Sequence, residues 1–200
     1  MRKHINSKYL RTSFIALLFL GLLSLIGCGS DSDSIPSGVF TDSAVSGLNY
    51  KSASFQGLTD ADGKFNYWQG ETVTFSIGNL VLGSATGAAQ LTPLSITSGA
   101  TAASDQIVNN KLILLQTLDT DGNLNKGIQI TEGIRNIVSA NAASINFNQT
   151  TAAFRTSLAA LMTALNGAGV FSDTDPRDRT VRTAAAALEH FTRSTSERIV

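Results

Sequence analysis

Apolar and polar positions alternate with a period of two along the chain after residue 38. Segments 64–67 and 72–77 place every second side chain on one side, a pattern typical of half-buried strands. Glycine and aspartate separate such segments at turn positions, as in 60–63. We predict an antiparallel β-module of five to seven short strands over 39–96. The apolar side chains expected to face one core are Phe65, Tyr67, Val73, Phe75 and Ile77.

The period changes to three or four residues after Pro93, which favours helices. Ser104 is placed to cap a helix reaching Leu118, and a second helix is expected after Thr131. A third is expected after Asn148 and a fourth near Pro176. The fourth carries a predicted apolar stripe of Val181, Ala184, Ala185, Leu188 and Phe191. The predicted fold class is therefore α+β: a small antiparallel β-sandwich-like module, followed over 97–200 by a compact helical part of about four helices.

The N-terminal residues have the pattern of an export signal. Four basic residues precede an apolar run over 14–26, and the small residue Gly27 follows that run. The run is shorter than the roughly 18 residues that a membrane-spanning helix needs. We therefore predict a signal peptide over 1–27 that is removed on export. The basic residues are Arg2, Lys3, Lys8 and Arg11.

The sequence Leu-Ile-Gly-Cys over 25–28 resembles the lipobox of bacterial lipoproteins. The resemblance implies that Cys28 is diacylglycerated, becomes the first residue and is then acylated on its amino group. Several acyl chains hold a protein on a membrane essentially permanently. In that family an Asp after the acylated cysteine retains the protein in the inner membrane, whereas Gly29 and Ser30 here imply the outer membrane of a Gram-negative bacterium. Cys28 is the only cysteine, which excludes an intramolecular disulfide.

Residues 28–38 are mostly glycine, serine and aspartate, and we predict that they form a flexible tether. Removal of 1–27 leaves 11 basic and 15 acidic residues, a net charge of −4. Such a chain has no basic stripe, so nucleic acid is excluded as a partner. The predicted partner is the membrane, reached through the N-terminal lipid, with any protein or glycan partner unidentified.

The stretch 57–65, Gly-Leu-Thr-Asp-Ala-Asp-Gly-Lys-Phe, resembles the hairpin of carboxypeptidase-regulatory-like, or transthyretin-like, β-sandwich modules. In it Asp60 accepts backbone hydrogen bonds, Gly63 takes a positive φ and Phe65 enters the core. Joined to 39–50, it is similar to the N-terminal region of uncharacterised exported lipoproteins. The resemblance implies a surface-displayed module and covers only the strand-rich half.

Asp119, Asp121, Asn123 and Asn125 place side-chain oxygens at every second position, as in loops that bind calcium. The pattern then departs from an EF-hand loop, because Leu124 stands at position 6 and Ile130 at position 12. A helix end that leads into an Asx turn explains the same residues without a metal. That explanation is favoured, so we expect no cofactor and keep calcium at these four residues as the one alternative.

Catalytic patterns are incomplete. His190 is the only histidine after residue 27, and its place on an amphipathic helix predicts a partly exposed polar residue rather than a base. The serine-nucleophile, phosphate-loop and dinucleotide motifs are absent from the sequence. Trp68 is a candidate for stacking on a glycan or partner, but covering the edge of the sheet is the favoured explanation. An acidic and basic cluster around Pro176 predicts the capped start of the last helix: Asp173, Asp175, Arg177, Asp178, Arg179 and Arg182.

These observations predict a lipid-anchored envelope lipoprotein with a non-enzymatic binding or structural role. Two alternatives stay open. The chain ends at Val200 close to its last predicted helix, so it could be the N-terminal accessory region of a larger exported enzyme. The calcium-like loop would instead suit a calcium-stabilised surface adhesion module.

Overall fold

The computed structural model describes residues 35–172 and 179–196. The predicted signal peptide 1–27, Cys28 and the first part of the tether lie outside the described residues. Residues Ile35–Val200 form one compact unit. Strand β1 already begins at Ser37, two residues before the predicted start of the β-module, because its first residues pair with β5.

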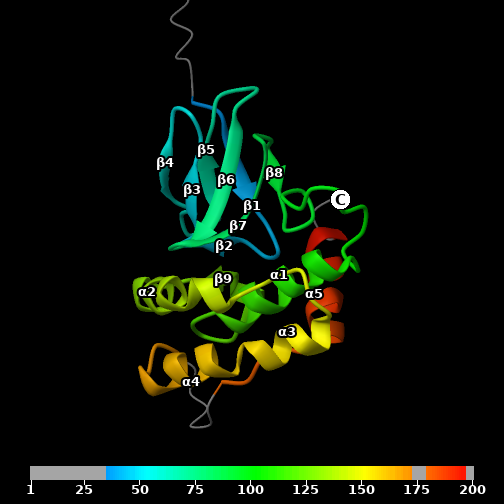
Figure 1. Ribbon diagram of the computed structural model, residues 1–200. Coiled ribbons are helices and arrows are strands. Elements are labelled where there is room, and N and C mark those ends of the chain that lie inside the picture. Colours follow the sequence, from blue (N-terminus) through cyan, green and yellow to red (C-terminus); the bar gives the residue numbers. More distant parts are fainter. Residues whose placement is uncertain (1–34, 173–178, 197–200) are drawn as a thin grey trace, which may run out of the picture. The chain divides into compact units, whose positions relative to one another are not determined.

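Eight short strands lie between Ser37 and Leu91; seven of them form two sheets, and β2 pairs instead with a strand between the helices. The four-stranded antiparallel sheet has the order β4-β3-β6-β7, and the three-stranded sheet has the order β5-β1-β8 (Figure 1). The strands are β1 (Ser37–Phe40), β2 (Val45–Ser46), β3 (Asn49–Lys51), β4 (Gln56–Leu58), β5 (Lys64–Asn66), β6 (Thr72–Ile77), β7 (Leu80–Thr86) and β8 (Gln90–Leu91).

Aromatic side chains from both sheets pack against one another. The ring of Phe75 on β6 lies 4.6 Å from that of Phe40 on β1 and 5.0 Å from that of Phe65 on β5. The predicted period-two pattern is confirmed here, because Phe65, Val73, Phe75 and Ile77 are buried, while Tyr67 is only half-buried. The sandwich-like arrangement follows from burying these alternating faces together.

Two of the strand pairings are parallel. Strand β1 pairs in parallel with β8, and β2 pairs in parallel with β9 (Ile128–Gln129), a strand between the helices. The second pairing joins segments more than 80 residues apart, and Arg135 reinforces it by donating to the carbonyl oxygens of Gly47 and Ile130. The strand-rich and helical parts are thus connected by backbone as well as by side chains.

Five α-helices occur among the described residues: α1 (Gln106–Thr117), α2 (Glu132–Asn141), α3 (Thr151–Ser157), α4 (Ala159–Gly167) and α5 (Ala184–Ser196), with short 3₁₀ helices η1 (Leu124–Lys126) and η2 (Ala142–Ser144). Thr131 caps α2 as predicted, and Asp105 rather than Ser104 caps α1. The predicted third helix is two helices, α3 and α4, which meet at Leu158. With this refinement the predicted α+β fold is confirmed.

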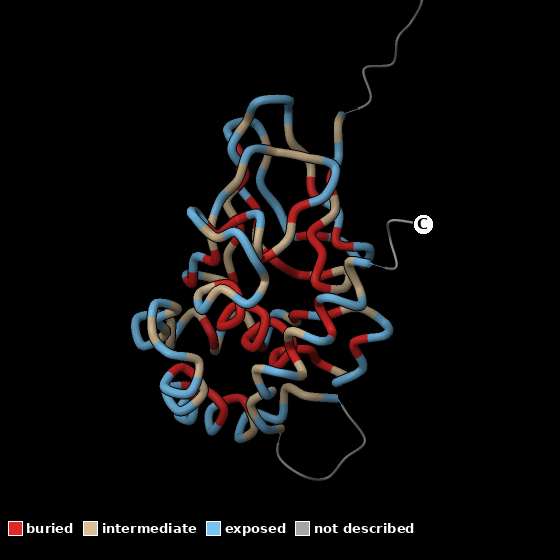
Figure 2. Tube along the Cα trace, turned by 90° about the vertical axis from the view of Figure 1, so that its right-hand side faces the viewer, coloured by how far each residue is buried: buried red, intermediate tan, exposed pale blue. Residues whose placement is uncertain are grey.

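Helix α1 lies in the centre of the unit, between the strands and helices α3 and α5 (Figure 1). Its residues from Val108 to Thr117 are all buried, as expected of a helix covered on every side. Buried positions gather where the helices meet the strands (Figure 2). A single hydrophobic core therefore runs through both parts of the unit.

The last helix differs from its prediction. Helix α5 begins at Ala184 rather than near Pro176, and its buried residues are Ala187, His190 and Phe191. Of the predicted stripe, Phe191 is buried and Val181 and Ala184 pack against the core, whereas Ala185 is exposed. None of the helices in the described part of the chain is both long enough and apolar enough to cross a membrane.

Candidate functional site

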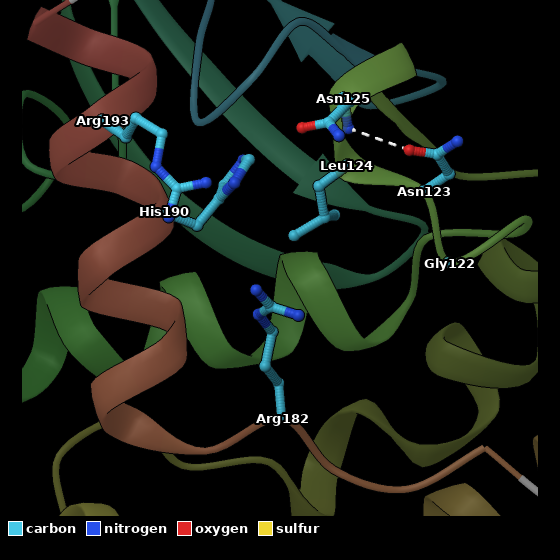
Figure 3. Close-up of a pocket in the computed structure, with 7 residues that line it drawn as sticks. All are labelled: Gly122, Asn123, Leu124, Asn125, Arg182, His190 and Arg193. Atoms are coloured by element: carbon cyan, nitrogen blue, oxygen red, sulfur yellow. Dashed lines mark hydrogen bonds between the residues drawn. The ribbon is translucent and has the colours of Figure 1, made fainter.

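An open hollow of about 250 Å³ lies between helix α5 and the loop after α1 (Figure 3). The loop contributes backbone and amide groups, whereas α5 and the segment before it contribute cationic side chains and a histidine. Its lining residues are Gly122, Asn123, Leu124, Asn125, Arg182, His190 and Arg193.

The spacing of residues on α5 brings two of these side chains together. His190 and Arg193 are three residues apart, so they lie on one helix face. Arg182 precedes the helix, and its backbone N–H donates to Thr117 Oγ1 on α1 at 3.0 Å. Figure 3 shows the Arg182 side chain extending toward His190 and Leu124. Three side chains rich in N–H donors thus meet at the hollow.

The opposite wall is built by consecutive Asx turns. Asp121 Oδ1 accepts a hydrogen bond from the Asn123 N–H at 2.8 Å, and Asn123 Oδ1 accepts one from the Asn125 N–H at 3.3 Å. These bonds lead the chain from Gly122, where φ is 68°, into the 3₁₀ helix η1. Asn and Asp favour this local geometry because their side chains can bond their own backbone two residues ahead.

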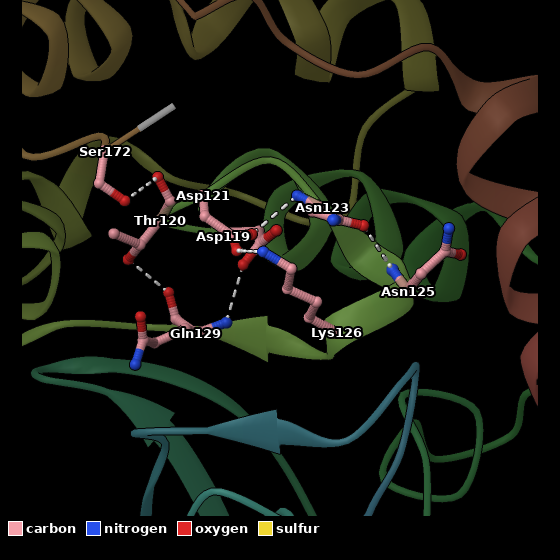
Figure 4. Close-up of polar contacts among 8 residues, drawn as sticks. All are labelled: Asp119, Thr120, Asp121, Asn123, Asn125, Lys126, Gln129 and Ser172. Atoms are coloured by element: carbon pink, nitrogen blue, oxygen red, sulfur yellow. Dashed lines mark hydrogen bonds and ion pairs between the residues drawn. The ribbon is translucent and has the colours of Figure 1, made fainter. Parts of the chain in front are cut away.

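The four residues predicted to bind calcium do not gather around one point of this loop (Figure 4). Asn123 and Asn125 border the hollow. Asp119 lies beneath the loop with 1% of its surface exposed, and its Oδ1 accepts from the Gln129 N–H at 2.9 Å. Asp121 Oδ2 lies 3.4 Å from Lys126 Nζ. Within residues 35–172 and 179–196, no group of three or more His, Cys, Asp or Glu side chains is arranged to hold a metal ion.

Burial raises the pKa of Asp119 to about 6, although its bond to the Gln129 N–H opposes the rise. The nearby charge of Asp121 raises it further. Asp119 Oδ2 is buried and has no hydrogen-bond partner among the described residues. Of the four residues predicted to bind calcium, only Asp119 and Asp121 therefore have neighbouring carboxyl oxygens that a cation could contact together.

His190 is buried, with 8% of its surface exposed, which corrects the expectation of a partly exposed residue. Its Nε2 lies 2.9 Å from Ser43 Oγ, and the Ser43 hydroxyl donates to the Leu124 carbonyl oxygen at 2.9 Å. With that hydroxyl proton used, Nε2 carries a proton and donates to Ser43 Oγ. The pair joins α5 to the loop and to the turn after β1, and in this arrangement His190 is not a base toward Ser43.

A buried carboxyl group lies next to Ser43. Asp42 is fully buried, and Gln116 Nε2 donates to both of its oxygens at 3.0 Å. Burial raises the pKa of Asp42 to about 7, against the effects of the Gln116 hydrogen bond and the positive charge of Arg182. Ser194 donates to the Asp42 backbone carbonyl, which ties this turn to α5.

Arg182 is the least satisfied cation of the hollow. Burial lowers its pKa, the charges of Asp42 and Glu189 raise it, and the nearby charge of Arg193 lowers it. Its Nε is buried with no hydrogen-bond partner in the described part of the chain, and its Nη2 donates to the Ala186 carbonyl at 3.5 Å, the limit of a hydrogen bond. Arg193 pairs with Glu189 at 2.8 Å on the surface. Two guanidinium groups therefore lie close enough to repel each other.

The remaining sequence candidates lie elsewhere. Trp68 is 40% exposed, and its ring packs 5.8 Å from that of Phe55. Arg179 stacks over the Phe171 ring at 4.5 Å and donates to the Asp119 carbonyl at 2.7 Å. The other members of the cluster around Pro176, at 173–178, lie outside the described residues.

The sequence did not identify Asp42, Ser43, Gln116 and Arg193 as neighbours of this site. Ser43 and His190 are 147 residues apart, so no local pattern links them. Only the three-residue spacing of His190 and Arg193 was a usable signal. Comparisons of the chain with models of protein families, with curated proteins and with solved structures find no match.

Proposed function

We propose that the protein is a lipid-anchored lipoprotein of the bacterial envelope that binds a ligand in the hollow between α5 and the loop at 119–129. The anchor is proposed from the lipobox-like sequence that ends at Cys28, and the outer membrane from Gly29 and Ser30 after it. The similarity of 57–65 to exported transthyretin-like modules agrees with this location. The described fold starts at Ile35, so residues 29–34 would link it to the lipid.

One observation carries the binding role: His190 is held by Ser43 while two arginines and two asparagines line the same open hollow. In ligand sites, a few polar side chains that converge on a concave surface fix the orientation of the ligand. Since the Ser43 hydroxyl donates to the Leu124 carbonyl, the pair supports a fixed wall rather than a nucleophile and its base. A binding role therefore suits this arrangement better than covalent catalysis.

The anchor is tested by metabolic labelling with an alkynyl fatty acid, together with detergent-phase partitioning of the full chain. The wild-type chain should carry the label and enter the detergent phase. Cys28→Ser should carry no label, because the acceptor thiol is absent, whereas the neighbouring variant Ser30→Ala should behave as the wild type. Labelling of Cys28→Ser, or no label on the wild-type chain, would refute the anchor.

A second candidate is a calcium-stabilised adhesion module. It is favoured by the buried Oδ2 of Asp119 beside Asp121, which has no hydrogen-bond partner within residues 35–172 and 179–196. A cation that binds only the folded chain raises its melting temperature. Melting with calcium, with magnesium and with a chelator tests this directly, and Asp121→Asn should reduce the calcium-dependent rise. Identical melting curves in calcium and chelator would exclude this function.

A further inference from the structure

We propose that the hollow binds a small hydroxylated oxyanion, with its carboxylate or phosphate group between Arg182 and Arg193 and its hydroxyl groups against Asn123 and Asn125. This inference rests on the proposed binding function and names the chemical class of the ligand. Both sources of the anionic group have the same requirement, namely oxygen atoms that accept hydrogen bonds from guanidinium donors.

The charge of the lining selects for an anion. Arg182 and Arg193 are both positively charged, and no carboxylate stands among the seven lining residues. The acidic groups around the hollow are occupied: Glu189 pairs with Arg193 at the surface, Asp121 pairs with Lys126, and Asp42 is fully buried with Gln116 on both oxygens. An anion between the two guanidinium groups would offset their mutual repulsion.

The Arg182 side chain has hydrogen-bond donors that the described residues leave unused. Among the described residues its only side-chain hydrogen bond is the 3.5 Å contact to Ala186, while its guanidinium extends into the hollow (Figure 3). An arginine fork pairs with a carboxylate or phosphate through two parallel hydrogen bonds, which are shorter and stronger than neutral ones. Arg193 can join from the turn of α5 that follows His190, since its pairing with Glu189 is solvent-exposed and weak.

The walls are held before any ligand arrives. The backbone of Arg182 bonds Thr117, His190 bonds Ser43, and Asn123 bonds the Asn125 backbone N–H. Each bond joins elements that are distant in the chain or shapes the loop itself. A site arranged in this way loses little conformational entropy on binding, which favours affinity for a small ligand.

Size and polarity narrow the ligand further. A volume of about 250 Å³ is below the roughly 300–1,000 Å³ of pockets that hold drug-sized molecules. The side-chain amide of Asn125 offers both a donor and an acceptor, and Asn123 offers amide donors. These groups match hydroxyls, and Leu124 provides an apolar surface for a carbon skeleton. A single sugar acid or sugar phosphate has this combination.

Isothermal titration calorimetry at fixed ionic strength tests the proposal with four probes: galacturonate, glucose 6-phosphate, neutral galactose and inorganic phosphate. At least one of the two charged sugars should bind, and galactose should not. Galacturonate binding indicates a carboxylate ligand, and glucose 6-phosphate binding a phosphate ligand. Inorganic phosphate should bind more weakly than the charged sugars; equal binding would overturn the hydroxyl contacts.

Two variants and a matched control locate the binding. Arg193→Gln, at an exposed position, should fold normally and weaken binding by about tenfold or more, because a charge-assisted bond is lost. Arg182→Gln should weaken it further, whereas Lys51→Gln, which removes an equal charge on β3, should leave it unchanged. Thermal melting of each variant confirms that it is folded.

The outcomes separate this inference from the proposed function. Galactose binding that is insensitive to both arginine variants would retain a binding role but overturn the oxyanion class. No binding of either charged sugar, or unchanged affinity in Arg193→Gln, would also overturn it. The lipid anchor is decided independently by the fatty-acid labelling of Cys28.

Discussion

The buried carboxyl group of Asp42 should make the protein less stable as pH rises toward neutrality. In the folded chain burial raises the pKa of this carboxyl from the ordinary 3.8 to about 7. The folded state therefore keeps a proton that the unfolded state loses. The stabilisation that comes from the protonated Asp42 carboxyl is fully present below about pH 4 and is lost as pH rises through 7. Burial of Asp119, with a pKa raised to about 6, acts in the same direction.

The magnitude follows from the difference between the two pKa values. Each pH unit between them lowers the free energy of unfolding by about 1.4 kcal/mol, because one proton is bound by the folded chain and released on unfolding. From about pH 5 to pH 8, Asp42 should therefore cost roughly 2 to 3 kcal/mol. Lys111, whose pKa burial lowers to about 8, adds stability only as pH rises above that value, so it falls outside this range.

Urea denaturation at several pH values measures this effect, with Asp42→Asn as the test variant. Asparagine keeps an oxygen for Gln116 and removes the titrating group, so the variant should show a flatter dependence by roughly 2 to 3 kcal/mol over the same range. Asp62→Asn, at an exposed site, is the matched control and should follow the wild type. The reasoning is refuted if Asp42→Asn keeps the full wild-type slope, or if the wild type gains stability between pH 5 and pH 7.

The remaining predictions concern the strand core and one turn. Phe75→Ala should lower the free energy of unfolding by about 3 to 5 kcal/mol, since the Phe75 ring is fully buried between both sheets. The control Val81→Ala, at a position 58% exposed, should change it by less than about 0.5 kcal/mol. Similar losses for the two variants in urea denaturation would contradict this assignment. Gly63→Ala should lower the melting temperature more than Gly70→Ala does. Both glycines have positive φ, but only at Gly63 would a Cβ lie 2.7 Å from the Phe40 carbonyl oxygen; equal losses would show that φ alone matters.

Local patterns in the sequence determined most elements. The alternation over 72–77 identified β6 and its buried face, because a strand repeats every two residues. Thr131 marked the start of α2, since its hydroxyl accepts from the Ile134 N–H. Asp60 likewise accepts from the backbone of Asp62 and Lys64, as the turn residues predicted. All these interactions join residues within four positions of one another.

Only the tertiary structure decided what lies far apart in the sequence and close together in the fold. The parallel pairing of β2 with β9 and the contact of Ser43 with His190 depend on how the elements pack. The periodicity of a helix also does not specify, to within one residue, which face of the helix turns toward the core. For this reason α5 buries His190 instead of exposing it, and two of the predicted calcium ligands border a cationic hollow. The sequence determined which segments form strands, helices and turns, whereas the packing of the shared core decided which polar groups meet.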